Sequence, residues 1–325
     1  MQRWGGVDLG GTKIQVVVVD ERFEVLGEER IPTPTAGGPQ DVADAIAGAV
    51  RSAASAAGVG SGDLSGIGVG SPGEADAATG TIAGARNLPG WEGSFPLGGK
   101  LTEALGPPVA IGNDVTVATD AEAALGAGRP YRSLLGVFWG TGVGGGLVLD
   151  GRPWLGRSSA GEIGHIVIQQ GGARCGCGRL GCLEAYAGRA SMERRARELV
   201  EKGEKTELFK IMEKRGRTRL TSGIWARALE HDDAMAVDLI DRGVKALAAG
   251  IASAQNLLDV DAIILGGGLG IRLGEPYKER IAEAMLEHLF VNERPPAFHV
   301  AQLGDLGGAI GAALLASRAA APAPL

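Results

Sequence analysis

Four side chains that suit a soft divalent metal ion lie close together in the sequence: His165, Cys175, Cys177 and Cys182. Cysteine thiolates and an imidazole nitrogen favour tetrahedral Zn²⁺. Four protein ligands leave no position for a reactive water, so we expect a structural zinc that fixes the loop from His165 to Glu184. The alternative, three reduced cysteines without a metal, is disfavoured because the chain has 3 cysteines and all belong to this cluster.

Glycine-rich turns follow three segments that are typical of strands. They are Gly10-Gly11, the run from Gly140 to Gly146, and the triplet Gly266, Gly267 and Gly268. Glycine lets the main chain approach phosphate oxygens closely in left-handed conformations. A single glycine pair is more often a plain hairpin or bulge, but three such turns together predict a nucleotide triphosphate site. No Gly-x-x-x-x-Gly-Lys-Ser/Thr run occurs, which excludes a P-loop.

Polar side chains next to the first two turns could complete this nucleotide site. Thr12 and Thr141 can each donate a hydroxyl to phosphate, and Lys13 could add positive charge. Asp8 could hold Mg²⁺ directly or through water. The predicted ligand is therefore a nucleotide triphosphate with Mg²⁺.

Carboxylates elsewhere could bind and activate a hydroxyl substrate. Asp114 is the candidate general base, although an Asp before a helix is as often an N-cap, and the sequence pattern alone leaves both open. Asn113 beside it has donor and acceptor groups that suit a vicinal diol. Glu162 and Glu184 flank the cysteine cluster, and carboxylates of this kind accept hydrogen bonds from polyols.

The elements that must position these groups form an α/β pattern. Alternating and β-branched residues predict strands over 5–9 and 14–19 with a partner over 23–30, then a helix over 42–53 and strands over 67–69 and 109–111. A helix over 115–125 follows Asp114. In the second half, strands over 134–138 and 147–149 flank the second glycine turn, so a strand, turn, strand unit is duplicated. A charged, solvated stretch (193–219), a helix (240–258), strands over 262–265 and 298–302 and a C-terminal helix complete the chain.

The length of 325 residues allows two domains. We expect a small N-terminal α/β lobe over 1–117, on which a C-terminal helix over about 308–322 packs back. The large lobe is expected over 118–307, with the zinc-binding loop at 165–184. Binding groups are therefore split between the two halves of the chain.

Composition narrows the class of partner. A net charge of -6 gives no basic field for nucleic acid or anionic lipid, and only Arg174 and Arg179 lie within the cysteine cluster, so small molecules are favoured. The first strand begins soon after Met1 without a signal peptide pattern, and the longest uncharged stretch, 133–149, is interrupted by glycines. We therefore expect a cytoplasmic protein without a membrane span.

The chain resembles the ROK group of repressors, open reading frames and sugar kinases, in the actin-like ATPase superfamily. The resemblance covers nearly the whole sequence. It implies a two-lobed actin-like (ribonuclease H-like) fold, with the first two glycine turns on phosphates and the third against adenosine. The motifs that carry it are the run from Asp8 to Lys13, Asn113-Asp114, Gly140 to Gly146 with Gly142 and Gly144, Gly161 to His165, Cys175 to Glu184, and Leu265 to Gly268.

The same resemblance assigns roles on the sugar side. It implies that Asp114 is the catalytic base and that Glu162 and Glu184 bind the hexose. His165 would ligate zinc with one ring nitrogen and meet a sugar hydroxyl with the other. Gly73 and Asn87 match further sugar-side loops of the family.

The predicted function is an ATP-dependent hexokinase that converts glucose to glucose 6-phosphate. Fructose, mannose, allose, N-acetylmannosamine and N-acetylglucosamine are alternative substrates, and polyphosphate is an alternative donor. A sugar-responsive repressor is a further alternative, but ROK repressors carry an added N-terminal helix-turn-helix domain, for which this sequence leaves no room. A non-catalytic sugar-binding regulator is disfavoured because Asp8, Thr12, Asn113, Asp114 and Thr141 are all present. We expect a homodimer or a dimer of dimers.

Overall fold

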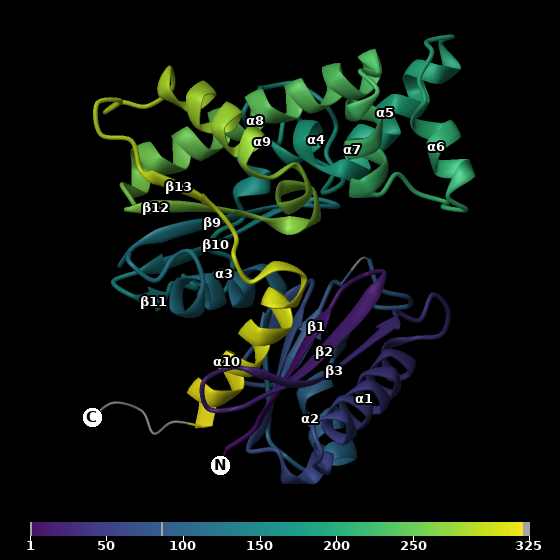
Figure 1. Ribbon diagram of the computed structural model, residues 1–325, viewed down its shortest axis with the longest axis vertical. Coiled ribbons are helices and arrows are strands. Elements are labelled where there is room, and N and C mark those ends of the chain that lie inside the picture. Colours follow the sequence, from purple (N-terminus) through teal and green to yellow (C-terminus); the bar gives the residue numbers. More distant parts are fainter. Residues whose placement is uncertain (1, 86, 321–325) are drawn as a thin grey trace. The chain divides into compact units, whose positions relative to one another are not determined.

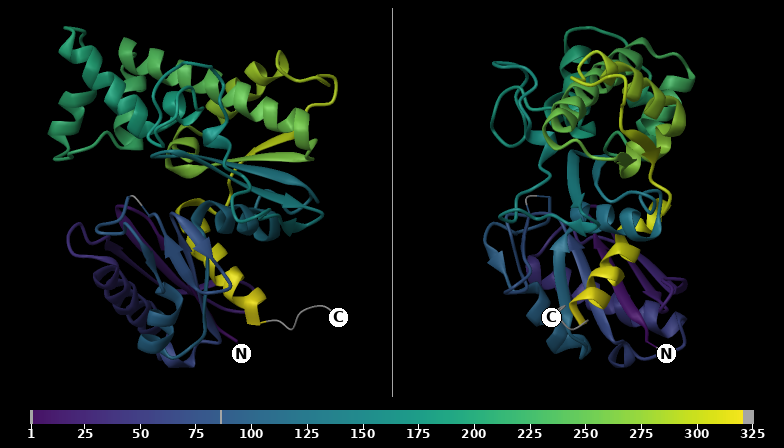
Figure 2. Two further views of the ribbon diagram at one scale, coloured as in Figure 1. Left: turned by 180° about the vertical axis from the view of Figure 1, so that it is seen from behind. Right: turned by 90° about the vertical axis from the view of Figure 1, so that its left-hand side faces the viewer.

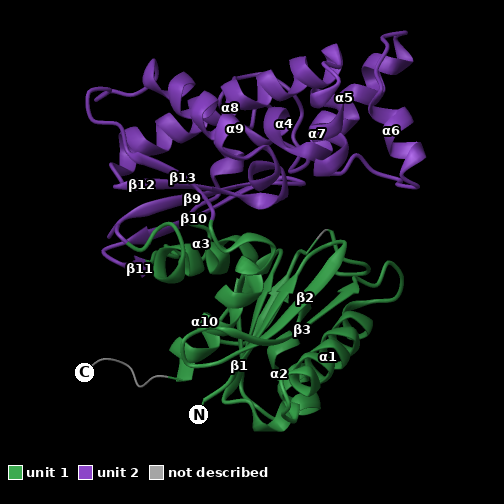
Figure 3. Cartoon of the chain, viewed as in Figure 1, with its two compact units in different colours: residues 1–129, 153–160, 302–325 green, residues 130–152, 161–301 purple. Residues whose placement is uncertain are grey.

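The computed structural model describes residues 2–85 and 87–320, and the chain forms two compact units (Figures 1 and 3). Unit 1 comprises residues 1–129, 153–160 and 302–325, and unit 2 comprises residues 130–152 and 161–301. The boundary expected at residue 117 thus differs from the division found, because α3 (Asp114–Leu125) packs against α10 (Gly307–Ala320) within unit 1. Residues 321 and 322 of the expected C-terminal helix lie outside the described residues.

Unit 1 contains a five-stranded sheet in the order β3-β2-β1-β4-β8. The antiparallel strands β1 (Trp4–Leu9), β2 (Lys13–Val19) and β3 (Val25–Pro32) are joined by tight turns, whereas β4 (Gly66–Ser71) and β8 (Val109–Asn113) run parallel to β1. All five strands expected in this half are confirmed. The parallel pairing brings the carboxyl ends of β1, β4 and β8 to one edge of the sheet.

Helices cover both faces of this sheet. Val16 and Val18 pack with α1 (Pro39–Ala56) and α2 (Leu97–Leu105), whereas Val17 and Val19 pack with α10. Successive strand residues point to opposite faces, so the run of four valines supplies both cores. Figure 2 shows α10, in yellow, lying across the strands of unit 1.

The contact between α10 and the sheet depends on glycines in the strands. A Cβ added to Gly6 or Gly68 would overlap the backbone carbonyl oxygen of Ala309 or Ala312. The strand and helix backbones cannot move apart without losing the packing of the side chains between them. This close approach sets the position of the first two turns of α10 on β1 and β4.

We expect Gly68→Ala to lower the free energy of unfolding by about 2 to 3 kcal/mol, because the added methyl group forces backbone displacement. The matched control is Gly48→Ala in α1, where nothing lies within 4 Å of the added Cβ and alanine favours the helix by up to about 1 kcal/mol. Urea denaturation of both variants measures the difference. Equal stability of Gly68→Ala and wild type would contradict this account of the packing.

A small sheet accompanies the main one in unit 1. It comprises β5 (Glu74–Asp76), β6 (Thr81–Ala83) and β7 (Ser94–Phe95), and was not expected from the sequence. Trp91 anchors it, because its Nε1 donates to the carbonyl oxygen of Ile82 at 3.1 Å and its ring meets Phe95 edge-on at 5.5 Å between centroids. Short 3₁₀ turns occur at Ser61–Asp63 and Gly304–Leu306.

Unit 2 repeats the plan of the first sheet. Its strand order is β11-β10-β9-β12-β13, with β9 (Leu134–Trp139) and β10 (Val143–Leu149) antiparallel and β12 (Ala262–Gly266) and β13 (Ala297–Val300) parallel to β9. β11 is the short segment Arg152–Pro153. The duplication expected from the glycine turns is confirmed in this shared topology.

The helices of unit 2 are inserted between strands of the second sheet: α4 (Glu184–Ala187) to α8 (Ala234–Leu258) lie between β11 and β12 along the chain, and α9 (Gly267–Leu286) lies between β12 and β13. The long helix α8 packs against α9 and α4 (Figure 1). The charged stretch over 193–219, which was expected to be solvated, covers most of α5 (Arg189–Glu201) and all of α6 (Leu208–Lys214). Helix α7 (Ser222–Glu230) follows it. α9 was missed, because Gly274, with φ of 61°, and Pro276 interrupt its pattern.

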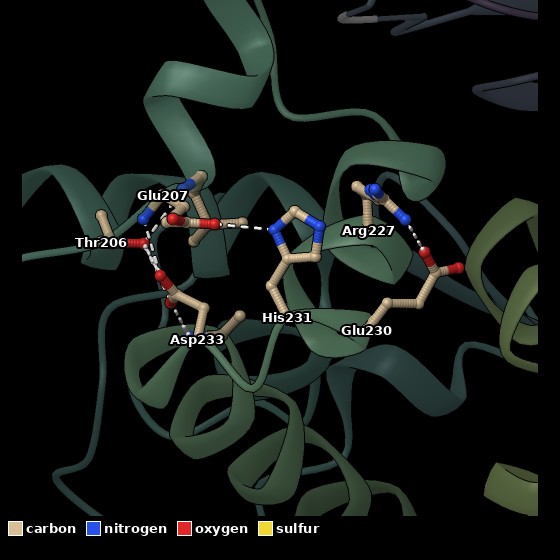
Figure 4. A network of polar contacts seen from close by, with 8 residues as sticks. Thr206, Glu207, Arg227, Glu230, His231 and Asp233 are labelled. Carbon is tan, nitrogen blue, oxygen red and sulfur yellow. Dashed lines mark hydrogen bonds and ion pairs between the residues drawn. The ribbon is translucent and has the colours of Figure 1, made fainter.

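Polar contacts fasten the ends of three helices together (Figure 4). Asp233 caps α8 by accepting from the backbone N–H of Ala236 at 2.9 Å, and it also accepts from the Thr206 hydroxyl at 3.0 Å. Glu207, which precedes α6, lies 2.7 Å from Nδ1 of His231 at the end of α7. The network therefore fixes α7, which carries a residue of the candidate site, to its neighbours.

Within the described residues, no helix has both the length and the apolar character needed to cross a bilayer.

Candidate functional site

The cysteine cluster forms a compact metal-binding geometry. The ligand atoms of His165, Cys175, Cys177 and Cys182 all lie within 4.8 Å of one another. The sulfur atoms of Cys177 and Cys182 are 3.8 Å apart, and Nδ1 of His165 is 3.9 Å from the sulfur of Cys175. Tetrahedral zinc with Zn–S bonds of about 2.3 Å places neighbouring sulfurs about 3.8 Å apart. The donor set and its spacing therefore fit Zn²⁺.

The thiols of the cluster differ in pKa. Burial raises the pKa of Cys175 to about 12, whereas the backbone N–H of Arg179 lowers the pKa of Cys177 to about 7. A buried thiol of this kind stays neutral near pH 7 by itself, and a bound divalent ion ionises it. A zinc ion bound by the cluster would hold the cysteines as thiolates.

The loop that carries the cluster is held by its own polar contacts. The Tyr186 hydroxyl donates to Oε1 of Gln169 at 2.9 Å and accepts from the backbone N–H of Ala173 at 2.8 Å. The 3₁₀ turn Ile163–His165 presents His165 from the opposite end of the loop. These contacts orient the ligands from both sides.

The two predicted sugar-binding carboxylates lie beside this metal centre. Oε2 of Glu162 is 3.8 Å from Nε2 of His165, the ring nitrogen that is turned away from Cys175. Oε1 of Glu184 is 3.6 Å from the sulfur of Cys175, and its Oε2 accepts from the backbone N–H of Val143 at 3.0 Å. Glu184 therefore links the cysteine loop to the second glycine turn.

The second glycine turn is shorter than expected. Its hydrogen bond runs from the N–H of Gly140 to the carbonyl oxygen of Gly142 at 3.0 Å, and β10 begins at Val143. Gly144, which was expected in the turn, lies in this strand. The glycines within β10 have a packing role, since a Cβ on Gly145 would lie 2.5 Å from the carbonyl oxygen of Gly161.

The third glycine turn joins a strand to a helix. Gly266 ends β12, and Gly267 and Gly268 begin α9. Gly267 has a φ of 79°, and a Cβ there would lie 2.6 Å from the carbonyl oxygen of Trp139. Only glycine satisfies both constraints. The backbone N–H groups of the first turn of α9 thus point out from the carboxyl end of β12, a common position for anions.

The first glycine turn lies in unit 1. The N–H of Gly10 donates to the carbonyl oxygen of Lys13 at 2.9 Å, and the exposed Thr12 lies between them in the sequence. A Cβ on Gly11 would lie 3.0 Å from Nδ2 of Asn87, so the predicted sugar-side Asn87 lies against this turn. Gly73, a further predicted sugar-side residue, has a φ of 90° at the start of the small sheet.

Asp8 lies at the carboxyl end of β1, next to the first turn. Burial raises the pKa of its carboxyl group, and the charge of Lys13 acts in the opposite direction. A Cβ on Gly308 would lie 2.9 Å from Cγ of Asp8, so the start of α10 closes on this carboxylate. A bound cation would favour the ionised form of Asp8.

The helix cap at the start of α3 is Asn113. Its Oδ1 accepts from the backbone N–H groups of Val115 and Thr116 at 3.1 Å, which commits the side-chain acceptor to the helix and leaves the amide N–H₂ as the donor. Asp114 is the first residue of α3, and its Oδ1 accepts from Val115 at 2.9 Å. The question of whether Asp114 is the cap is therefore settled in favour of Asn113.

The sheet of unit 1 brings these polar residues to one edge. Asp8 pairs with Gly70 of β4, and Asn113 pairs with Ser71 of the same strand. Asp8, near the end of β1, and Asp114, directly after β8, thus lie at the same edge of the sheet, with β4 between the two strands. A second group of predicted site residues belongs to unit 2. It comprises the metal ligands, Glu162, Glu184 and the second and third glycine turns.

Sequence reasoning missed one charged residue at the second turn. The Arg189 guanidinium donates to the Thr141 hydroxyl and to the Ser222 hydroxyl, each at 2.8 Å. Its partners are 48 and 33 residues away in the sequence, so no local pattern could have identified it.

The chain matches known proteins along nearly its whole length. The family model described as the ROK family matches residues 4–319. The chain is 36% identical over 315 residues to a glucokinase of Halalkalibacterium halodurans, covering 95% of this chain and 93% of that protein.

Two solved structures have the same fold along nearly the whole chain. The crystal structure of the ROK hexokinase from Thermus thermophilus superposes with a TM-score of 0.80 at 35% identity and covers 98% of this chain and 99% of that one. The crystal structure of a ROK family glucokinase from Streptomyces griseus in complex with glucose and AMPPNP gives a TM-score of 0.82 at 32% identity, covering 97% and 99%. From its glycine turns, its Cys₃His loop and this full-length match, the chain belongs to the ROK family.

Proposed function

We propose that the protein is an ATP-dependent hexokinase that transfers the γ-phosphoryl group of ATP to glucose and forms glucose 6-phosphate. The observation that carries this proposal is the edge of the unit 1 sheet, where Asn113 caps α3 and Asp114 follows it, beside Asp8 and the first glycine turn. Phosphoryl transfer to a hydroxyl requires a base, a Mg²⁺ ligand and a phosphate-binding turn, and a candidate for each lies at the same edge of this sheet.

The reaction assigns a task to each polar group. Asp114 accepts the proton of the attacking sugar hydroxyl. The sugar oxygen then bonds to the γ-phosphorus while the bond from that phosphorus to the β–γ bridging oxygen breaks, and ADP leaves. Asp8 would hold Mg²⁺, which would neutralise charge on the phosphates, and the hydroxyls of Thr12 and Thr141 with the charge of Lys13 orient the phosphates.

The sugar is held by groups whose chemistry matches a polyol. Glu162, Glu184 and Nε2 of His165 accept from or donate to ring hydroxyls, and the amide group of Asn113 donates. Asn87 and the loop at Gly73 complete the set. Zinc would have a structural task here, since His165 and the three cysteines would supply all four of its ligands and so fix the orientation of the imidazole ring.

Glucose is proposed because the relatives at 35 to 36% identity are named glucokinase or hexokinase. Other relatives that cover 95% of the chain, at 30 to 32% identity, are named kinases of N-acetylgalactosamine or N-acetyl-D-glucosamine. Epimers and N-acetylated amino sugars differ by single groups, which small changes of pocket geometry can accept or reject. The expected ligands are thus a hexose and ATP. A cytoplasmic location and a symmetric homodimer stay predictions.

The test is sugar-dependent ADP formation by the purified protein. The panel contains glucose, fructose, mannose, allose, N-acetylglucosamine and N-acetylmannosamine, each with ATP, GTP or polyphosphate as donor. We expect the highest kcat/KM with glucose and ATP. A higher kcat/KM with an N-acetylated sugar would show that this sugar, and not glucose, is the preferred substrate. No turnover with any combination of sugar and donor would contradict the proposed function.

A further inference from the structure

Arg189 is held against the second glycine turn by its backbone as well as by its side chain. Its N–H donates to the carbonyl oxygen of Gly140 at 3.1 Å, and the next N–H, of Ala190, donates to Thr141 at 2.9 Å. A Cβ on the preceding Gly188 would lie 3.4 Å from the Cα of Gly142, so the start of α5 touches the turn directly. The guanidinium is therefore a fixed part of the turn rather than a mobile surface charge.

The Arg189 cation has only neutral hydrogen-bond partners in the part of the chain that the structure describes. Its two partners are the hydroxyls of Thr141 and Ser222. The nearby carboxylate of Glu193 is already bound by Arg197 at 2.8 Å and Arg219 at 3.1 Å. Burial lowers the pKa of Arg189, and the charge of Arg219 lowers it further, while Glu193 acts in the opposite direction. A partly buried cation in this setting is stabilised by an anion.

The direction of the two hydrogen bonds has a consequence for the hydroxyls. A guanidinium only donates, so the oxygens of Thr141 and Ser222 must accept from it. Their own protons therefore point away from Arg189 and are available to a ligand. Ser222 Oγ lies 3.5 Å from the position that a Cβ on Gly268 would occupy, in the first turn of α9. Two oriented O–H donors and one cation thus lie between the second and third glycine turns.

We infer that Arg189 is a positioning residue for the phosphates of the nucleotide. It orients Thr141 and Ser222 as donors and supplies positive charge to the phosphoanhydride that spans the two turns. This inference rests on the proposed kinase function, since it assumes that these turns bind the nucleotide. The competing explanation is purely structural, in which Arg189 only joins α5 to α7.

The experiment compares Arg189→Gln and Arg189→Lys with the wild type. Calorimetry measures the Kd values of ATP and AMP, and the sugar-dependent assay gives kcat and the KM values of ATP and sugar. We expect Arg189→Gln to weaken ATP binding about 10- to 100-fold, as loss of charge-assisted hydrogen bonds does. AMP binding and the KM of the sugar should change less than about threefold. Arg189→Lys should recover part of the ATP affinity, because it keeps the charge without the planar fork.

The ratio of the ATP and AMP effects separates the two explanations. Unchanged ATP binding, or an equal loss for ATP and AMP, would overturn the phosphate role. If Arg189→Gln does not fold, as judged by thermal unfolding, Arg189→Lys carries the same comparison. The matched control is Arg227→Gln in α7, whose side chain pairs with Glu230 at 2.7 Å on the surface (Figure 4) and should leave both affinities unchanged.

Failure of the kinase proposal gives a different pattern. In that case the wild type forms no sugar-dependent ADP with any hexose, whereas the ATP and AMP affinities of the variants still decide whether Arg189 recognises phosphate.

Discussion

Asp114→Asn is expected to lower kcat about 100- to 10,000-fold while the Kd of the sugar stays within about threefold of the wild-type value. The amide keeps the size and most hydrogen bonds of the carboxylate but cannot accept the proton of the attacking hydroxyl. The expected loss is therefore specific to turnover. Steady-state kinetics and sugar binding by calorimetry measure the two quantities separately.

Two features of the structure make this variant informative. Asn113, not Asp114, caps α3, so the change should leave the helix intact. The matched control is Asp150→Asn, since Asp150 is an exposed residue that pairs with Arg132 at 3.6 Å. Asp150→Asn should have the wild-type kcat. A wild-type kcat for Asp114→Asn would show that Asp114 is not the general base.

Cys177→Ser is expected to reduce bound zinc to well below one ion per chain and to lower the midpoint of thermal unfolding by roughly 10 °C. A serine hydroxyl is a poor ligand for Zn²⁺, and the remaining three ligands cannot close a tetrahedral structural site. Because Glu162 and Glu184 lie beside the cluster, sugar binding should weaken as well. Metal content is measured by plasma emission spectrometry and stability by calorimetry.

A second pair of variants separates metal loss from general damage. His165→Gln should behave like Cys177→Ser, whereas His288→Gln, at an exposed histidine 3.4 Å from Glu287, should keep its zinc and stability. Treatment of the wild type with a strong chelator should reproduce the loss, and added Zn²⁺ should reverse it. A metal-free sample with full activity and an unchanged unfolding midpoint would contradict the structural role of zinc.

Much of the fold could be predicted because its signals are local. The β-branched residues over 14–19, which include four consecutive valines, predicted a strand, and β2 confirms it; the structure adds that Val16 to Val19 are buried. The metal cluster could also be predicted from the sequence, because its four ligands lie close together along the chain. Glycine turns after strands identified both halves of the duplicated core.

Features that depend on distant contacts could not be predicted in this way. Arg189 acquires its position from Thr141 and Ser222, which lie far from it in the sequence. The second turn was predicted too long because Gly145 is required for packing against Gly161 and not for a turn. The strands β5 to β7 have two or three residues each, too few for an alternating pattern to be recognised.

The most direct test of the central claim is identification of the products after incubation of the purified protein with ATP, Mg²⁺ and glucose. Phosphorus and carbon NMR of the mixture reports the phosphate ester and its position, and chromatography reports the nucleotides. The account predicts one ADP and one glucose 6-phosphate for each ATP consumed. ADP with inorganic phosphate in equal amounts, formed at the same rate with and without sugar, would contradict it.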